Sequence, residues 1–95
     1  MFGSTYAVSW RSNGSHCAGR LDVGERAVLL TGAANGCRVR EAIAFREIAR
    51  VQVERGRMHL VRRDGRSLSI SSLDAPGALR ELAERLALKA EGGRR

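Results

Sequence analysis

Aromatic side chains are scarce in this chain. Its 95 residues include one tryptophan, one tyrosine and two phenylalanines. Sheets that bind single-stranded nucleic acid usually stack bases on several exposed aromatic rings. Tyr6, Trp10 and Phe45 belong to apolar patterns that assign them to the core, Trp10 as an anchor, which leaves only Phe2 near the start. The sequence therefore argues against base stacking, and weak nucleic-acid binding through an arginine-rich sheet face is a third hypothesis.

Long apolar runs are also absent. No segment approaches the roughly 20 apolar residues of a membrane span, and residues 1–10 lack the basic start and apolar run of a signal peptide. We expect a cytoplasmic protein, either free or bound peripherally to a membrane. A chain of 95 residues has room for one modest core. We expect one domain over residues 1–91 and a disordered basic tail over residues 92–95.

Residues that carry reactive chemistry are few. The only histidines and cysteines are His16, Cys17, Cys37 and His59, and no two have the short spacing of zinc ligands on one turn. They form no set of nucleophile, base and orienting acid, and the glycines form no phosphate-binding loop. We therefore predict no enzyme, no metal site and no cofactor. We expect Cys17 and Cys37 to be free, partly buried thiols, with one disulfide between them as the alternative.

Turn signals recur at short intervals and divide residues 5–72 into apolar segments. They are Asn13-Gly14, Gly24, Asn35-Gly36, Gly56 and Asp64-Gly65. Asn-Gly and Asp-Gly tolerate the positive φ of tight hairpin turns. This spacing predicts an antiparallel meander.

The segments between these turns are predicted to form strands. Apolar and polar residues alternate most cleanly over residues 67–71, which favours a hairpin with the strand that carries Met58 and Leu60. The run 27–31 is apolar on both faces, so we expect it at the centre of the core. Gly19 within a predicted strand suggests a bend or a close backbone approach. The alternation of apolar and polar residues shifts at residues 46–48, which predicts a turn there.

A helix is expected after the last strand. Asp74 can cap its first amides, Pro76 suits its first turn, and Gly92-Gly93 ends it. The predicted core face is Ala75, Ala78, Leu79, Leu82, Ala83 and Leu86. Leu88 falls near the polar side, where it is either a tolerated exposed leucine or a candidate partner contact.

The basic residues give a net charge of +7, and they are concentrated in one part of the chain. Residues 38–66 hold nine arginines against four acids, and Arg62 and Arg63 form a candidate basic surface. Such a face attracts phosphate groups on lipids or nucleic acid. The alternative is an ordinary solvated surface, because Lys89 is the only lysine among seventeen basic residues and genome composition can produce that bias.

The expected order of elements resembles the pleckstrin-homology (PH) superfold. Residues 19–30 and 43–51 are similar to small bacterial PH-like domains. The resemblance implies a mainly β (α+β) fold, in which about seven antiparallel strands form a bent sheet or partly open barrel capped by one C-terminal helix. Members of this superfold bind phosphoinositides, peptides or other proteins, and bacterial members are often implicated in self-association. Fold alone does not choose among these functions.

The leading hypothesis is a non-catalytic module that binds a protein or peptide, including a second copy of itself. An exposed sheet edge can accept an extended peptide, and the gap between strand and helix can hold its side chains. The alternative is docking on an anionic, phosphoinositide-like membrane. The candidate anion-binding residues for this alternative are Arg11, Arg20, Arg38 and Arg40. The region of the first hairpin offers few basic side chains for it.

Overall fold

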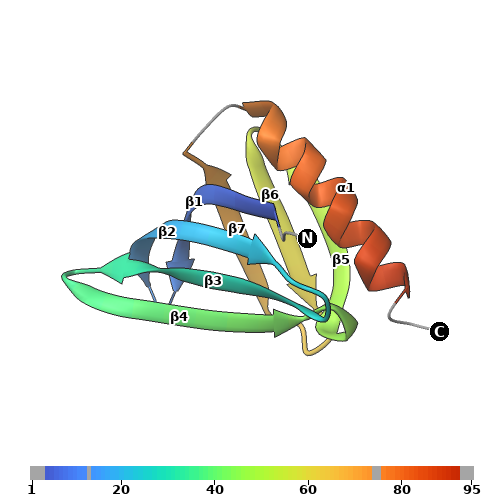
Figure 1. Cartoon of the computed structure of the whole chain (residues 1–95), viewed down its shortest axis with the longest axis horizontal. Coiled ribbons are helices and arrows are strands. Elements are labelled where there is room, and N and C mark those ends of the chain that lie inside the picture. The colour runs from blue at the N-terminus through green and yellow to red at the C-terminus, as the bar shows by residue number, and fades with distance from the viewer. Residues whose placement is uncertain (1–3, 13, 74–75, 93–95) are drawn as a thin grey trace.

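Seven strands and one α-helix form the described part of this protein, which in the computed structural model comprises residues 4–12, 14–73 and 76–92. The elements are β1 (Ser4–Ser12), β2 (Ser15–Val23), β3 (Ala27–Ala34), β4 (Cys37–Ala44), a 3₁₀ turn η1 (Phe45–Glu47), β5 (Ile48–Glu54), β6 (Arg57–Arg62), β7 (Ser67–Ser72) and α1 (Pro76–Gly92). Figure 1 shows α1 beside β5 and β6. The predicted mainly β fold with a C-terminal helix is confirmed, as is the turn expected at the period slip.

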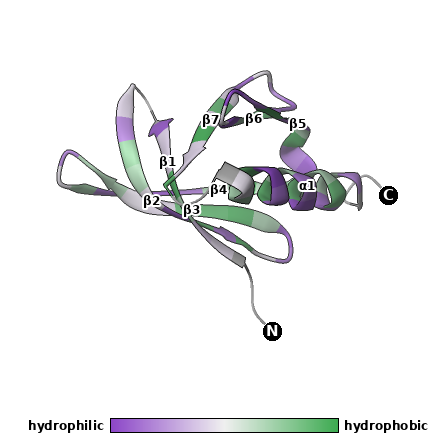
Figure 2. Ribbon diagram, turned by 90° about the horizontal axis from the view of Figure 1, so that it is seen from above, coloured by the Kyte–Doolittle hydropathy of each residue, from purple (hydrophilic) through white to green (hydrophobic). Residues whose placement is uncertain are grey.

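All seven strands belong to one open antiparallel sheet with the order β4-β3-β2-β1-β7-β6-β5. Its two halves, β1 to β4 and β5 to β7, meet where the first strand pairs with the last. That pairing is short, because it runs only from Val8↔Ser72 to Trp10↔Ile70. Beyond Trp10 the two strands part. In Figure 2 the β1–β2 hairpin and β7 accordingly lead in different directions from the centre of the sheet.

Tight turns join the neighbouring strands as the turn signals predict. Asn35 and Gly36 both adopt positive φ, 51° and 79°, as a two-residue hairpin loop requires. In the β6–β7 turn the Asp64 carboxylate accepts hydrogen bonds from the backbone and side chain of Arg66. These bonds, above all the backbone one, lower the pKa of Asp64.

A close backbone approach occurs at Gly19, as predicted. Gly19 pairs with Gly32, and a Cβ on either glycine would collide with a backbone carbonyl oxygen of the other strand, that of Thr31 or Ala18. A Cβ on Gly32 would also lie 2.9 Å from the Trp10 ring. Trp10 is 2% exposed, so its predicted role as a core anchor is confirmed.

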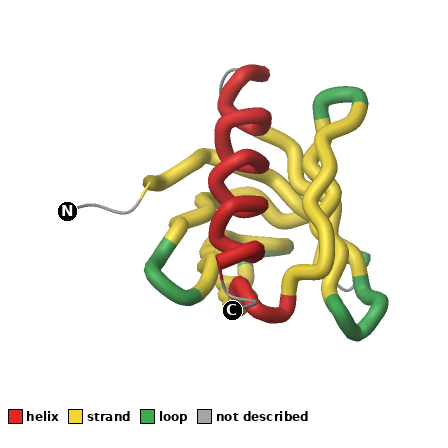
Figure 3. Tube along the Cα trace, turned by 90° about the vertical axis from the view of Figure 1, so that its right-hand side faces the viewer, coloured by secondary structure: helices red, strands yellow, loops and turns green. Residues whose placement is uncertain are grey.

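One cluster of buried side chains joins both halves of the sheet to α1. The helix contributes Leu79, Leu82, Ala83 and Leu86 as predicted, and Ala90 in addition. Ala78 is only half-buried, and Asp74 and Ala75 lie outside the described residues. Figure 3 shows the helix lying across the strands on one side only.

Two sequence-based expectations about the core hold only in part. The run 27–31 contributes Val28 and Leu30 to the buried core, but Leu29 is only half-buried, because α1 covers one side of the sheet and Leu29 lies on the other. The thiols are both free, but neither is partly buried: Cys17 is buried and Cys37 is exposed. Gly92 ends the helix, and residues 93–95 of the expected tail lie outside the described residues.

No helix among the described residues is long and apolar enough to span a membrane.

Candidate functional site

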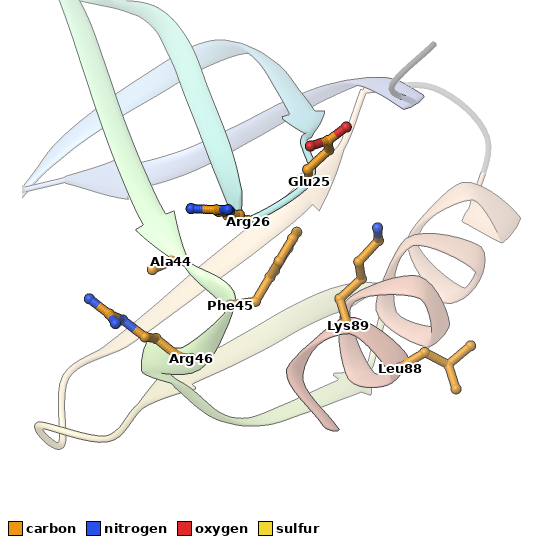
Figure 4. Close-up of a pocket in the computed structure, with 7 residues that line it drawn as sticks. All are labelled: Glu25, Arg26, Ala44, Phe45, Arg46, Leu88 and Lys89. Atoms are coloured by element: carbon orange, nitrogen blue, oxygen red, sulfur yellow. The ribbon is translucent and has the colours of Figure 1, made fainter. Parts of the chain in front are cut away.

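A groove lies where the end of β4, the β2–β3 turn and the last turns of α1 meet. Its volume is about 720 Å³. We call it the Phe45 groove. Its lining residues are Glu25, Arg26, Ala44, Phe45, Arg46, Leu88 and Lys89 (Figure 4).

Two hydrogen bonds fix the segments that form the walls of the Phe45 groove. The Phe45 amide donates to the carbonyl of Arg26 at 2.9 Å, which joins η1 to the β2–β3 turn. The Glu47 carboxylate accepts a bond from the Ala44 amide at 3.0 Å and so fixes the start of η1. The 3₁₀ turn η1, which accounts for the break in the alternation at residues 46–48, therefore forms one wall of this groove.

The charges around the Phe45 groove are mostly positive. Lys89 Nζ lies 5.8 Å from the centre of the Phe45 ring, within the range of a cation–π contact. Arg26 and Arg46 lie on the opposite side of the ring (Figure 4). Glu25 is the only acid of the lining, and the ion pairs found among the described residues include none of these four side chains.

Leu88 lies at the rim of this groove, where Figure 4 shows it directed away from Phe45. It is 70% exposed. An exposed leucine beside an apolar groove is typical of a contact surface, whereas a single exposed leucine elsewhere needs no explanation.

The four arginines proposed for anion binding do not form one cluster. Arg20 and Arg40 lie two strands apart in one register row, with Thr31 between them, and Arg38 lies in the next row of the same exposed face. Arg20 also pairs with Asp22 at 3.2 Å. Arg11 lies apart, at the end of β1 opposite His16.

The candidate basic surface at Arg62 and Arg63 requires a correction. The Arg62 guanidinium lies 2.8 Å from the Glu41 carboxylate, and its side chain is only 14% exposed. This ion pair links β6 to β4, so Arg62 contributes no free surface charge. Arg63 is exposed, but its Nε donates to the carbonyl of Arg46 at 2.7 Å.

A second groove was not predicted from the sequence. It lies between the β1–β2 hairpin and β7, and its volume is about 520 Å³. We call it the serine groove. Its lining residues are Ser9, Trp10, Arg11, Gly14, His16, Arg57, Ser67, Ser69 and Ser71. The alternation in β7 places three serines on one face, but the sequence does not show that β1 lies beside them.

Among the described residues, no group of three or more His, Cys, Asp or Glu side chains is placed to hold a metal ion. His59 Nδ1 lies 2.9 Å from the hydroxyl of Ser69.

Comparisons with known proteins identify a fold and no function. No protein-family model matches the chain, and no curated protein matches it. One similar solved structure is described as the C-terminal domain of an unknown protein from Leishmania infantum. The TM-score is 0.66 at 11% sequence identity, and the match covers 88% of this chain and 82% of the other. At that identity the likeness shows a shared fold alone, and the PH resemblance stays a prediction.

Proposed function

We propose that this chain is a non-catalytic interaction module that binds a protein partner through the Phe45 groove. One observation carries the proposal: an aromatic floor, an exposed leucine and unpaired charges occur together around one groove. Protein-binding sites commonly combine an apolar pocket with a polar rim.

The lining indicates the chemistry of the partner. The apolar part of the groove, at Ala44 and Phe45, suits an aliphatic or aromatic side chain. Three basic side chains against Glu25 favour a neighbouring acidic group on the partner. The occupant we propose is therefore a protein segment with an apolar side chain next to an aspartate or glutamate.

The test is selection of binders from a random peptide library displayed on phage, followed by affinity measurements on the selected peptides. We expect apolar residues next to acids to be enriched. Lys89→Glu should weaken binding at least tenfold, because it reverses a charge on the groove wall. Arg80→Glu makes the same charge change on an exposed part of α1 outside the groove and should leave binding unchanged.

A second pair of variants tests the apolar rim. Leu88→Ser should weaken binding, whereas Leu73→Ser changes a leucine that is 55% exposed outside the groove and should not. Equal effects within each pair, or selected peptides without acidic residues, would refute the proposal. Sedimentation of the free protein identifies the partner as a second copy if Leu88→Ser abolishes a dimer.

Docking on an anionic membrane is a second candidate. Arg38 and Arg40 favour it, because both are exposed on the edge strand β4 and belong to none of the ion pairs found among the described residues. Co-sedimentation with neutral and anionic vesicles at low and physiological salt tests it. Binding to anionic vesicles that persists at physiological salt and is lost on Arg38→Glu/Arg40→Glu would support this function, and loss at physiological salt would exclude it.

A further inference from the structure

We infer that the serine groove binds a small ligand that carries a phosphate group. The groove exists because β1 and β7 stop pairing after Trp10↔Ile70, which separates Arg11 from Ser69 across the sheet. Polar side chains from β1 and β7 line the groove between the parted strands. Two features of this lining, its hydroxyls and its charges, indicate the ligand.

The hydroxyls come from neighbouring strands. Ser9 pairs with Ser71 across β1 and β7, and Ser69 lies next along β7 on the same face. Ser9 is only 7% exposed, and it belongs to the groove lining. Among the described residues, the buried side-chain polar atom found without a hydrogen-bond partner is Trp10 Nε1, and Trp10 lines the same groove. A buried donor without a partner is unfavourable, and a ligand oxygen in the groove would satisfy it.

Two arginines flank these hydroxyls. Arg57 pairs with Ser71 across β6 and β7, so Ser9, Ser71 and Arg57 lie in one register row. Arg11 lies on β1, which is on the opposite side of β7 from Arg57 and β6. Neighbouring strands are about 4.8 Å apart, so side chains from β1 and β6 can both reach a ligand above β7.

The charge of the groove lining is positive. Neither Arg11 nor Arg57 belongs to any ion pair found among the described residues, and the lining contains no acid. Glu54 lies directly opposite Arg57 on β5 but is not part of the lining. His16 lies opposite Arg11, and His59 binds Ser69 at 2.9 Å, which orients its hydroxyl.

A phosphate group fits this set of donors better than a carboxylate does. Its several oxygens can accept bonds from two guanidinium groups and from serine hydroxyls at once. A volume of about 520 Å³ holds a phosphate and a small organic group. Trp10, the only Trp, Tyr or Phe of the lining, is 2% exposed, so the groove offers no large exposed aromatic ring for base stacking.

The test is titration of the full chain, followed by amide NMR shifts, with inorganic phosphate and with glycerol 3-phosphate, against chloride at equal ionic strength. We expect saturable shifts at Arg11, Ser69 and Ser71 with the two phosphate compounds. Arg57→Gln should weaken this binding at least tenfold, and Ser9→Ala severalfold. Arg50→Gln changes an exposed arginine outside the groove and should have no effect.

Vesicles distinguish a lipid headgroup from a free phosphate compound. Binding to phosphatidylcholine vesicles that contain phosphatidylinositol 4-phosphate, removed by Arg57→Gln, would assign a headgroup. Binding of glycerol 3-phosphate without such vesicle binding would assign a soluble ligand. Absence of both, shifts equal to those in chloride, or an equal effect of Arg57→Gln and Arg50→Gln would overturn the inference. The serine groove shares no residue with the Phe45 groove, so either proposal can fail alone.

Discussion

At the scale of single residues, Gly32 determines whether Trp10 fits into the core. A Cβ at Gly32 would lie 2.9 Å from the Trp10 ring and would collide with the Ala18 carbonyl oxygen. We expect Gly32→Ala to lower the free energy of unfolding by about 1–3 kcal/mol, because a well-packed site cannot accept the methyl group without strain. Urea denaturation followed by tryptophan fluorescence measures the change.

Gly77→Ala is the matched control for this substitution. A Cβ at Gly77 has open space around it, and alanine favours a helix. The control should leave stability unchanged or raise it by up to about 1 kcal/mol. A loss at Gly32 no larger than the change at Gly77 would show that the sheet adapts to the added methyl group.

At the scale of elements, the Glu41–Arg62 ion pair ties β4 to β6, which are not neighbours in the sheet. Glu41→Ala leaves the largely buried Arg62 guanidinium without its carboxylate. We expect a loss of about 1–3 kcal/mol in the free energy of unfolding, because an unpaired buried donor keeps its desolvation penalty. Urea denaturation measures it.

An exposed ion pair provides the comparison. Arg20→Ala removes the pair with Asp22, in which the Arg20 side chain is 64% exposed, and should change stability by less than about 0.5 kcal/mol. Replacement of both partners by apolar residues, Glu41→Leu/Arg62→Met, should recover much of the loss. If Glu41→Ala costs no more than Arg20→Ala, the pair does not stabilise the link between the sheet halves.

The elements differ in how far the sequence predicts them. Hairpins and the helix depend on local signals, such as Asn35-Gly36, Asp64-Gly65 and the apolar face of residues 79–86, and these were predicted. The pairing of β1 with β7 joins distant segments, and no local pattern selects that neighbour. The serine groove follows from this pairing, so its residues could not be brought together from the sequence.

The position of Arg62 was also predicted incorrectly, because its charge outweighed the strand pattern in that prediction. Arg62 has the same strand parity as Met58 and Leu60, which places it on the inner face, yet its charge favoured a surface position. Its partner Glu41 lies 21 positions earlier in the chain. Only the folded sheet brings the two together, and the pairing removes Arg62 from the candidate basic surface.

At the scale of the whole molecule, one core joins Trp10 in the first strand to Leu86 in the last helix. This continuity predicts one cooperative unfolding unit. Leu86→Ala should lower the free energy of unfolding by about 2–5 kcal/mol, because it leaves a cavity under the helix. Trp10 fluorescence reports on the first half of the sheet and circular dichroism at the helix band reports on α1, so both midpoints should fall together.

Leu88→Ala is the control on the solvent side of the same helix, and at 70% exposure it should change stability by less than about 0.5 kcal/mol. Separate midpoints in Leu86→Ala, with the Trp10 transition unmoved, would mean that α1 and the first four strands unfold independently. Coincident midpoints would mean that a partner bound at the Phe45 groove also protects the strands of the serine groove against unfolding. Ligand binding to the folded state protects every element of a cooperative unit against unfolding.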